Sequence, residues 1–138
     1  MTPQHLAEQT AGRFAAGVGA AALTHERRAD HTVVAVSGEL DFSSTPRLRE
    51  RLFVALRDPG AYIVIDLADV TFCDASGLAL LVGARRRAEA TGAAVILNRP
   101  RPQVARLLRV TGLSHGFTVR STGADARDAG PDVQSPAA

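Results

Sequence analysis

Residues 66–83 read DLADVTFCDASGLALLVG, and this stretch contains the change of pattern on which the fold depends. It continues residues 62–67 (YIVIDL), an almost continuously apolar run that is typical of a central strand covered on both faces. After Asp74 the apolar residues recur at helical spacing instead. The residues expected to face the core are Leu80, Leu81, Ala84 and Ala88. We therefore predict a buried strand that passes through a short loop into a helix from about Ser76 to Ala90.

Two strands and a helix are predicted ahead of this segment. Residues 21–27 and the β-branched run in residues 32–37 predict an opening hairpin, and Gly38 is expected to end its second strand. Pro46 follows a Ser-Ser-Thr cluster and opens a helix that Asp-Pro-Gly at 58–60 stops. The apolar positions on one face of that helix are Leu48, Leu52, Ala55 and Leu56.

The elements after the quoted stretch complete an α/β pattern. Residues 93–97 (AAVIL) predict another buried strand, Pro102 opens a helix that Gly112 closes, and residues 117–120 predict a last short strand. The inward positions of that helix are Val104, Leu107 and Leu108. The order predicts a single α/β domain with a mixed sheet of about five strands and three or more helices.

The length and composition of the chain fit a single domain. The chain has 138 residues, and we predict flexible tails at 1–20 and 121–138 around a domain at 21–120. Neither a secretion signal nor an apolar run of about 20 residues is found, so we expect a soluble cytoplasmic protein without membrane contact. Basic and acidic residues are nearly balanced, 16 against 14, which argues against nucleic-acid binding.

The sequence lacks the residues that several kinds of functional site require. Every basic residue is arginine, which excludes a P-loop and a Schiff-base enzyme because both need a lysine. Cys73 is the single cysteine and is expected to be buried and inert. No metal is predicted, because no Cys or His lies at ligand spacing from another. The histidines, expected at the surface, are His5, His25, His31 and His115. The run of arginines at 85–87 is expected to be a solvated helix face, because successive side chains diverge by about 100°.

Two motifs follow each other along the chain. Residues 38–41 read GELD after the second strand, and residues 66–78 read DLADVTFCDASGL. Together they resemble the STAS domain of bacterial anti-sigma factor antagonists, whose second motif is of the type D-L-S-x-V-x-F-x-D-S-S-G-L. The resemblance covers roughly residues 20–120 and implies a STAS-like fold. It also implies a non-enzymatic switch without a cofactor of its own, in which the antagonist binds an ATP-dependent anti-sigma kinase, frees a sigma factor and is inactivated by serine phosphorylation.

The resemblance and the pattern around the loop indicate a set of partner-binding residues. These are Asp41, Asp74, Ala75, Ser76, Gly77, Leu78, Val82 and Arg86. The outward face of the helix, with Ala79, Val82 and Gly83 opposite the core and Leu78 at its edge, is small and apolar and would admit a partner. Simpler structural roles also stand: Asp74 as a helix cap, Asp41 in ordinary turn chemistry and Ser76 as a bracing hydroxyl.

The sequence departs from the family at the decisive position, because Ala75 stands where the phosphorylated serine is expected. Ser76 matches the second serine of the pattern. Either Ser76 accepts the phosphate, or this member binds its partner without being switched. A phosphate beside the start of a helix would add nearly two negative charges and could release a partner without refolding.

Three alternatives remain at this stage. The chain could be a STAS module in a larger signalling assembly whose switch lies in another subunit. It could be a receiver-like phosphoryl acceptor built around Asp66, Asp69 and Asp74, although the missing lysine counts against this. Nucleotide binding at residues 74–77 would rest on a helix start without a glycine-rich cradle.

Overall fold

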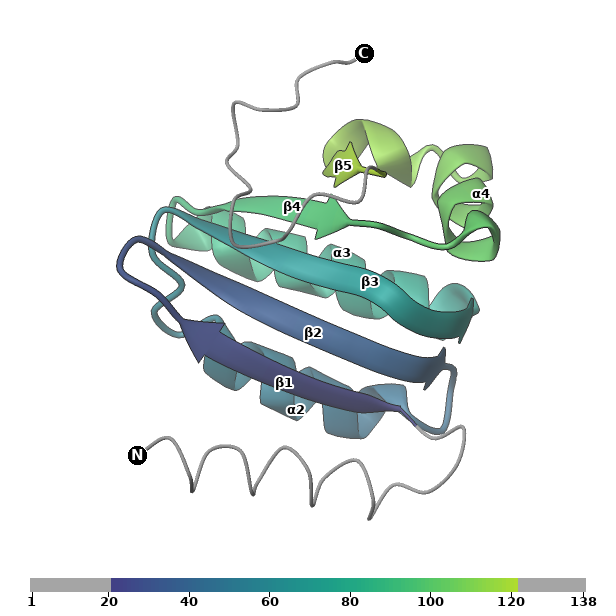
Figure 1. Ribbon diagram of the computed structural model, residues 1–138, viewed down its shortest axis with the longest axis horizontal. Coiled ribbons are helices and arrows are strands. Elements are labelled where there is room, and N and C mark those ends of the chain that lie inside the picture. Colours follow the sequence, from purple (N-terminus) through teal and green to yellow (C-terminus); the bar gives the residue numbers. More distant parts are fainter. Residues whose placement is uncertain (1–20, 122–138) are drawn as a thin grey trace.

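A computed structural model describes residues 21–121, which form one mixed sheet and its covering helices (Figure 1). The elements, in chain order, are β1 (Ala22–Arg27), β2 (His31–Leu40), α2 (Thr45–Ala55), β3 (Tyr62–Cys73), α3 (Ala75–Ala90), β4 (Ala94–Asn98), α4 (Pro102–Val110), the 3-10 helix η1 (Leu113–Gly116) and β5 (Thr118–Arg120). The five strands of the described residues lie in sequence order, β1 antiparallel to β2 and all other pairs parallel. The predicted fold class is confirmed. Both predicted tails, except Ser121, lie outside the described residues.

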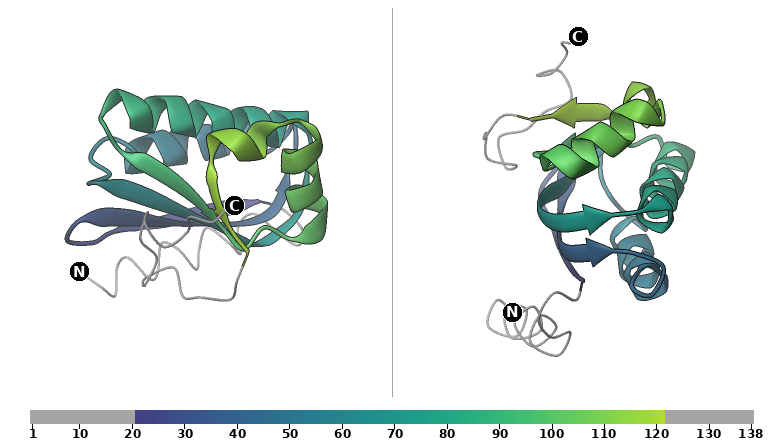
Figure 2. Two further views of the ribbon diagram at one scale, coloured as in Figure 1. Left: turned by 90° about the horizontal axis from the view of Figure 1, so that it is seen from above. Right: turned by 90° about the vertical axis from the view of Figure 1, so that its right-hand side faces the viewer.

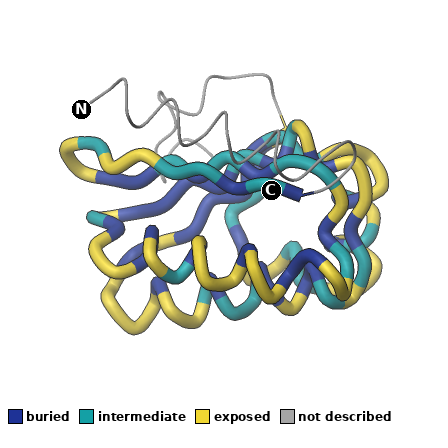
Figure 3. Tube along the Cα trace, turned by 90° about the horizontal axis from the view of Figure 1, so that it is seen from below, coloured by how far each residue is buried: buried dark blue, intermediate teal, exposed yellow. Residues whose placement is uncertain are grey.

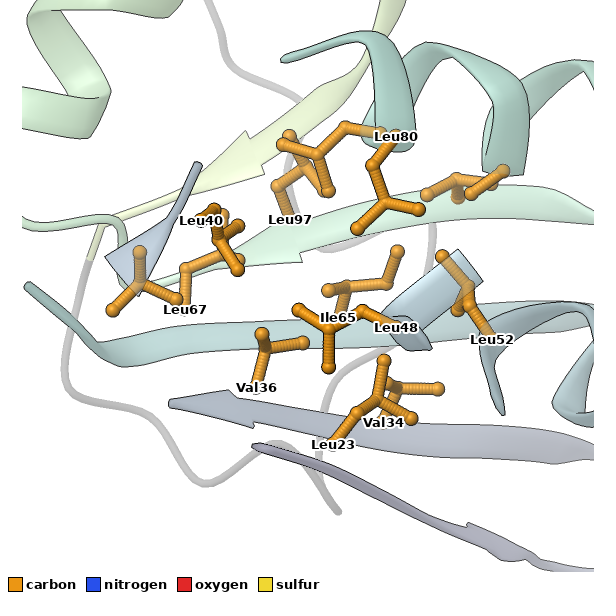
Figure 4. Packing of buried hydrophobic residues seen from close by; sticks show 14 of the residues in the cluster. Leu23, Val34, Val36, Leu40, Leu48, Leu52, Ile65, Leu67, Leu80 and Leu97 are labelled. Atoms are coloured by element: carbon orange, nitrogen blue, oxygen red, sulfur yellow. The ribbon is translucent and has the colours of Figure 1, made fainter. Parts of the chain in front are cut away.

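The helices α2 and α3 cover one face of the sheet, and α4 lies at the end of the sheet, against the carboxyl end of β3 and against η1 (Figure 2). The main core fills the space between these helices and the sheet, where the predicted inward residues of α2 and α3 are all buried. In Figure 4, Leu48 and Leu52 of α2 and Leu80 of α3 lie over side chains of the strands. Figure 3 shows buried positions along the strands and exposed ones on the outer sides of the helices.

The opening hairpin is confirmed, but Gly38 does not end β2. The strand continues to Leu40, and Gly38 adopts φ +88° inside it, a backbone conformation that glycine tolerates best. The register between the two strands shifts at this point. Gly38 of β2 is paired with Val70 of β3, but the next residue, Glu39, is paired with Phe72, so Thr71 has no partner in β2. β3 thus holds one extra residue, as in a β-bulge.

The predicted loop after residue 67 is also strand. A second slip of register lies opposite Ala35 to Ser37, so β3 bulges twice. The residues of this stretch that stay buried are Leu67, Val70 and Cys73, three positions apart rather than two. Strict alternation is lost, which explains why DLADVTF does not read as a strand. The last pair between β3 and β4 is Asp66 with Asn98, so β3 projects past β4 (Figure 1).

The remaining elements follow the prediction closely. In α4, Val104 and Leu108 are buried and Leu107 is half-buried. Gly112, with φ +79°, follows the end of α4 as predicted, and β5 pairs with β4 despite its short length. No helix within residues 21–121 has both the length and the apolar character that a membrane crossing requires.

His31 is a correction to the predicted surface histidines. It is 5% exposed, its Nδ1 lies 2.7 Å from Asp30 Oδ1, and its ring stacks on Tyr62 at 4.5 Å between centroids. The register explains the burial, because His31 and Tyr62 are paired residues of adjacent strands. His5 lies outside the described residues.

Candidate functional site

The two motifs of the sequence lie against each other at one end of the sheet. The register pairs Leu40 with Cys73, and the Asp74 N–H donates to the Leu40 carbonyl at 3.1 Å. We call residues 41–44 and 74–77 together the Asp74 surface. Parallel strands end at the same edge of a sheet, which is why the starts of α2 and α3 are neighbours here.

Asp74 caps helix α3. Its Oδ1 accepts from the N–H groups of Ser76 at 2.8 Å and Gly77 at 3.3 Å, and α3 begins at Ala75. This satisfies two backbone donors that the first helical turn leaves without a partner. The structural role predicted for Asp74 is confirmed. A contact with a partner stays a prediction.

Asp41 holds the turn that leads into α2. Its Oδ1 accepts from Ser43 Oγ at 2.9 Å and from the N–H groups of Ser43 and Ser44, each at 3.0 Å. These donors, the Ser43 hydroxyl first, hold the pKa of the Asp41 carboxyl below its ordinary value. The predicted turn chemistry is present, and the carboxylate fixes the backbone beside Asp74.

Two exposed aromatic side chains at this end were missed by the sequence prediction. Phe42 is 81% exposed within the turn that Asp41 holds, and Phe72, near the end of β3, is 42% exposed. A phenylalanine between Asp41 and Ser43 is the clue that the sequence contained, because an apolar residue in a polar turn has no core to face. Large exposed apolar side chains that gather in one region mark interaction sites.

The residues of α3 that were predicted to face outward or to bind a partner differ in their exposure. Ala75, Ala79 and Arg86 are exposed, while Ser76, Val82 and Gly83 are half-buried. Gly77, also predicted to bind the partner, is buried.

Leu78 is a correction, because it is only 7% exposed and belongs to the core. Arg85, seven residues on and so on the same side of the helix, lies over the Phe117 ring at 5.1 Å. Phe117 thus lies near α3 at Arg85, two turns beyond Leu78. Leu78 itself is closed off from a partner because it is buried in the core.

The three consecutive arginines point apart, as predicted. Arg85 lies over Phe117, and Arg87 lies over Phe53 at 4.7 Å. Arg86 and Arg87 are exposed, but Arg85 is half-buried, so the face is not solvated throughout. These side chains do not form a single track for a phosphate backbone.

Cys73 is buried, as predicted, and its inertness stays a prediction. Its side chain lies in the core, and burial, helped by the charge of Asp74, raises its pKa to about 12. The thiolate that nucleophilic chemistry needs is therefore disfavoured at neutral pH.

The acidic residues of the receiver alternative do not come together. Asp66 Oδ2 accepts from Arg99 Nη2 at 2.7 Å, and its Oδ1 accepts from the Ala68 N–H. Because the strand continues past Asp66, Asp74 lies roughly 25 Å further along at about 3.3 Å per residue. Residues 21–121 hold no group of three or more Asp, Glu, His or Cys that could bind a metal ion. The predicted acidic cluster is wrong.

Comparisons with known proteins agree on one family. The family model described as the STAS domain matches residues 22–126. An anti-sigma-B factor antagonist of Listeria monocytogenes is 34% identical over 96 residues, which is 70% of this chain and 84% of the relative. The anti-sigma-B factor antagonist of Bacillus subtilis is 38% identical over 80 residues, 58% of this chain and 72% of the relative.

Solved structures are similar in fold. An anti-sigma factor antagonist from Mycobacterium paratuberculosis superposes with a TM-score of 0.66 at 28% identity and covers 78% of this chain and 92% of its own. The anti-sigma factor antagonist SpoIIAA in its unphosphorylated form gives a TM-score of 0.64 at 25% identity, with 78% and 91% covered.

Proposed function

This chain belongs to the STAS domain family, and on that premise we propose that it is an anti-sigma factor antagonist. Its relatives in Listeria and Bacillus carry this activity in their names. The finer proposal is that it binds an anti-sigma factor of the ATPase or kinase type in the cytoplasm and so frees a sigma factor. It acts by binding and carries out no catalysis.

The observation that carries the proposal is the exposure of Phe42 in the turn beside Asp74. A fully exposed phenylalanine stabilises a complex by roughly 1.5–3 kcal/mol when a partner buries it. Aromatic side chains at the centre of a contact commonly dominate the binding energy. Phe42 thus adds an anchor to the residues predicted from the sequence.

The rest of the contact follows from the exposed residues around this anchor. Ala75 at the start of α3 lets a partner backbone approach closely, and Arg86 lies further along the same helix for a contact at the rim. Asp41 and Asp74 contribute by holding the two turns in place. Leu78 has no part in this contact, because it is buried.

We propose further that partner binding is not switched at the start of α3 in this member. Position 75 is exposed but is an alanine, and Ser76 is half-buried with its N–H held by Asp74. The exposed position at the start of α3 therefore carries no hydroxyl, and the hydroxyl of Ser76 belongs to a half-buried residue.

The experiment is capture of partners from a lysate of the native host, with matched baits. The unsubstituted chain is compared with Phe42→Asp and with Val54→Asp, which changes an exposed apolar residue near the end of α2. An ATPase-type anti-sigma factor should be recovered by the unsubstituted chain and by Val54→Asp, and lost with Phe42→Asp. Purified partner and calorimetry then give the loss in affinity.

Two outcomes would reject the proposal. Equal recovery of the anti-sigma factor by all three baits would remove Phe42 from the contact. Recovery of the subunits of a signalling assembly, without an anti-sigma factor, would favour the alternative in which this domain is one module of that assembly.

A further inference from the structure

Gln103 of α4 joins its side-chain amide to the last residue of β3. Its Oε1 accepts from the Cys73 N–H at 3.0 Å, and its Nε2 donates to the Cys73 carbonyl at 3.0 Å. The amide thus bonds to the backbone in both directions, as a neighbouring strand would. Cys73 directly precedes Asp74, the cap of α3.

The position of this contact follows from the projecting end of β3. The pairing of β3 with β4 ends at Asp66 and Asn98, and α4 begins four residues later, at Pro102. Beyond that pair, Arg101 Nε donates to the Ala68 carbonyl at 2.6 Å, and Gln103 holds Cys73. Side chains at the start of α4 therefore take over the hydrogen bonds that β4 no longer supplies.

We propose that Gln103 is a positioning residue for the Asp74 surface. The opposite side of Cys73 is held by β2, where the Asp74 N–H reaches the Leu40 carbonyl. Gln103 fixes the remaining side, so the Cys73 backbone is held from both neighbours. This fixes the direction in which the chain leaves β3, and with it the place of the Asp74 carboxylate that caps α3.

The side chain of Gln103 is exposed, whereas Cys73 is buried. Replacing Gln103 therefore creates no cavity in the core, but it leaves a buried N–H and carbonyl without their partner. The effect is local to the end of β3 and the start of α3. The role rests on the proposed function, since what is positioned is the proposed partner surface.

The experiment compares three variants by hydrogen exchange of individual amides, followed by NMR. Gln103→Leu removes both bonds. Gln103→Glu at neutral pH keeps an acceptor for the Cys73 N–H but loses the donor. Arg106→Leu, an exposed residue further along α4, is the control. In Gln103→Leu the amides of Cys73, Ser76 and Gly77 should exchange about tenfold faster, as loss of bonds of this strength requires.

Gln103→Glu should keep most of the protection of the Cys73 amide, and Arg106→Leu should change none of the three. The thermal midpoint of Gln103→Leu should stay close to that of Arg106→Leu, while its affinity for the anti-sigma factor falls several-fold. Unchanged exchange in Gln103→Leu, faster exchange throughout the sheet, or unchanged affinity would overturn the proposal. If the unsubstituted chain binds no anti-sigma factor, the proposed function fails, while the exchange data still test the contact with Cys73.

Discussion

Gly77 lies so close to Leu40 that a Cβ atom on Gly77 would stand 2.7 Å from the Leu40 Cβ. The same atom would stand 2.6 Å from the Cys73 Sγ. The first turn of α3 thus rests directly on the ends of β2 and β3. Real Cβ atoms do not approach so closely, so any side chain at position 77 must push the helix away from the sheet.

Gly77→Ala should therefore destabilise the domain. Overpacking of this kind costs about 1–3 kcal/mol, which exceeds the gain of up to about 1 kcal/mol from replacing glycine in a helix. Urea unfolding gives the difference. Gly83→Ala is the control, because its Cβ would meet only the Phe53 ring at 4.0 Å. It should be neutral or stabilising, and equal losses in both variants would contradict the close contact.

Removal of the Asp74 cap should cost about 1 kcal/mol in unfolding free energy, as other helix caps do. The variant is Asp74→Ala, measured by urea unfolding. Asp74→Asn retains an oxygen that can accept from the Ser76 N–H, and it should keep most of the stability. A loss in Asp74→Asn as large as in Asp74→Ala would mean that the charge, and not the cap, is what stabilises.

The Cys73 thiol should resist alkylation in the folded protein at neutral pH. The thiolate is the reacting species, and burial raises the thiol pKa to about 12 from 9.0. A thiol reagent should react only when denaturant is added, followed by mass spectrometry. Rapid reaction under native conditions would show that the thiol is accessible.

The same shift in pKa predicts a change of stability with pH. Between about pH 9 and pH 12 the unfolded chain loses the Cys73 proton while the folded chain keeps it. The unfolded state then binds fewer protons, so the unfolding free energy should fall as pH rises through this range. Cys73→Ala should lose that part of the fall, and identical pH curves for the two proteins would contradict the assignment.

Asn98→Leu should leave the stability unchanged or raise it by about 1 kcal/mol. Asn98 is fully buried between Asp66 and Arg120 of the adjacent strands, and within residues 21–121 no group bonds to its Oδ1 or Nδ2. A buried polar group without a partner is costly, and an apolar side chain of similar size removes that cost. Thermal and urea unfolding give the change. Asp66→Leu, which breaks the bond to Arg99, should by contrast be destabilising.

Ala75→Ser should create a phosphate acceptor if the partner is a kinase. The purified partner and ATP are incubated with the unsubstituted chain, with Ala75→Ser and with Ser76→Ala, and the modified position is mapped by mass spectrometry. Phosphate should appear at position 75 of Ala75→Ser and be absent from the unsubstituted chain. Modification of the unsubstituted chain that is lost in Ser76→Ala would show that Ser76 is the acceptor after all.

Local patterns were enough to predict the order of the elements. The helical spacing around Leu80 and Ala84 and the apolar runs of β3 and β4 reflect burial, which acts on each residue directly. The motifs at residues 38–41 and 66–78 were enough to indicate the family. The burial of Cys73 and the capping role of Asp74 also followed from their neighbours in the sequence.

The tertiary structure decided everything that depends on contact between distant segments. The two bulges of β3 arise from its pairing with β2, which no local pattern in residues 67–73 encodes. Leu78 is buried in the core between α3 and the sheet, and His31 is buried where it stacks against Tyr62 of the adjacent strand. The bonds of Gln103 to Cys73 join residues 30 positions apart. Sequence periodicity indicates which face of a helix or strand is buried. Which residues of different elements come into contact is determined only by the packing of those elements.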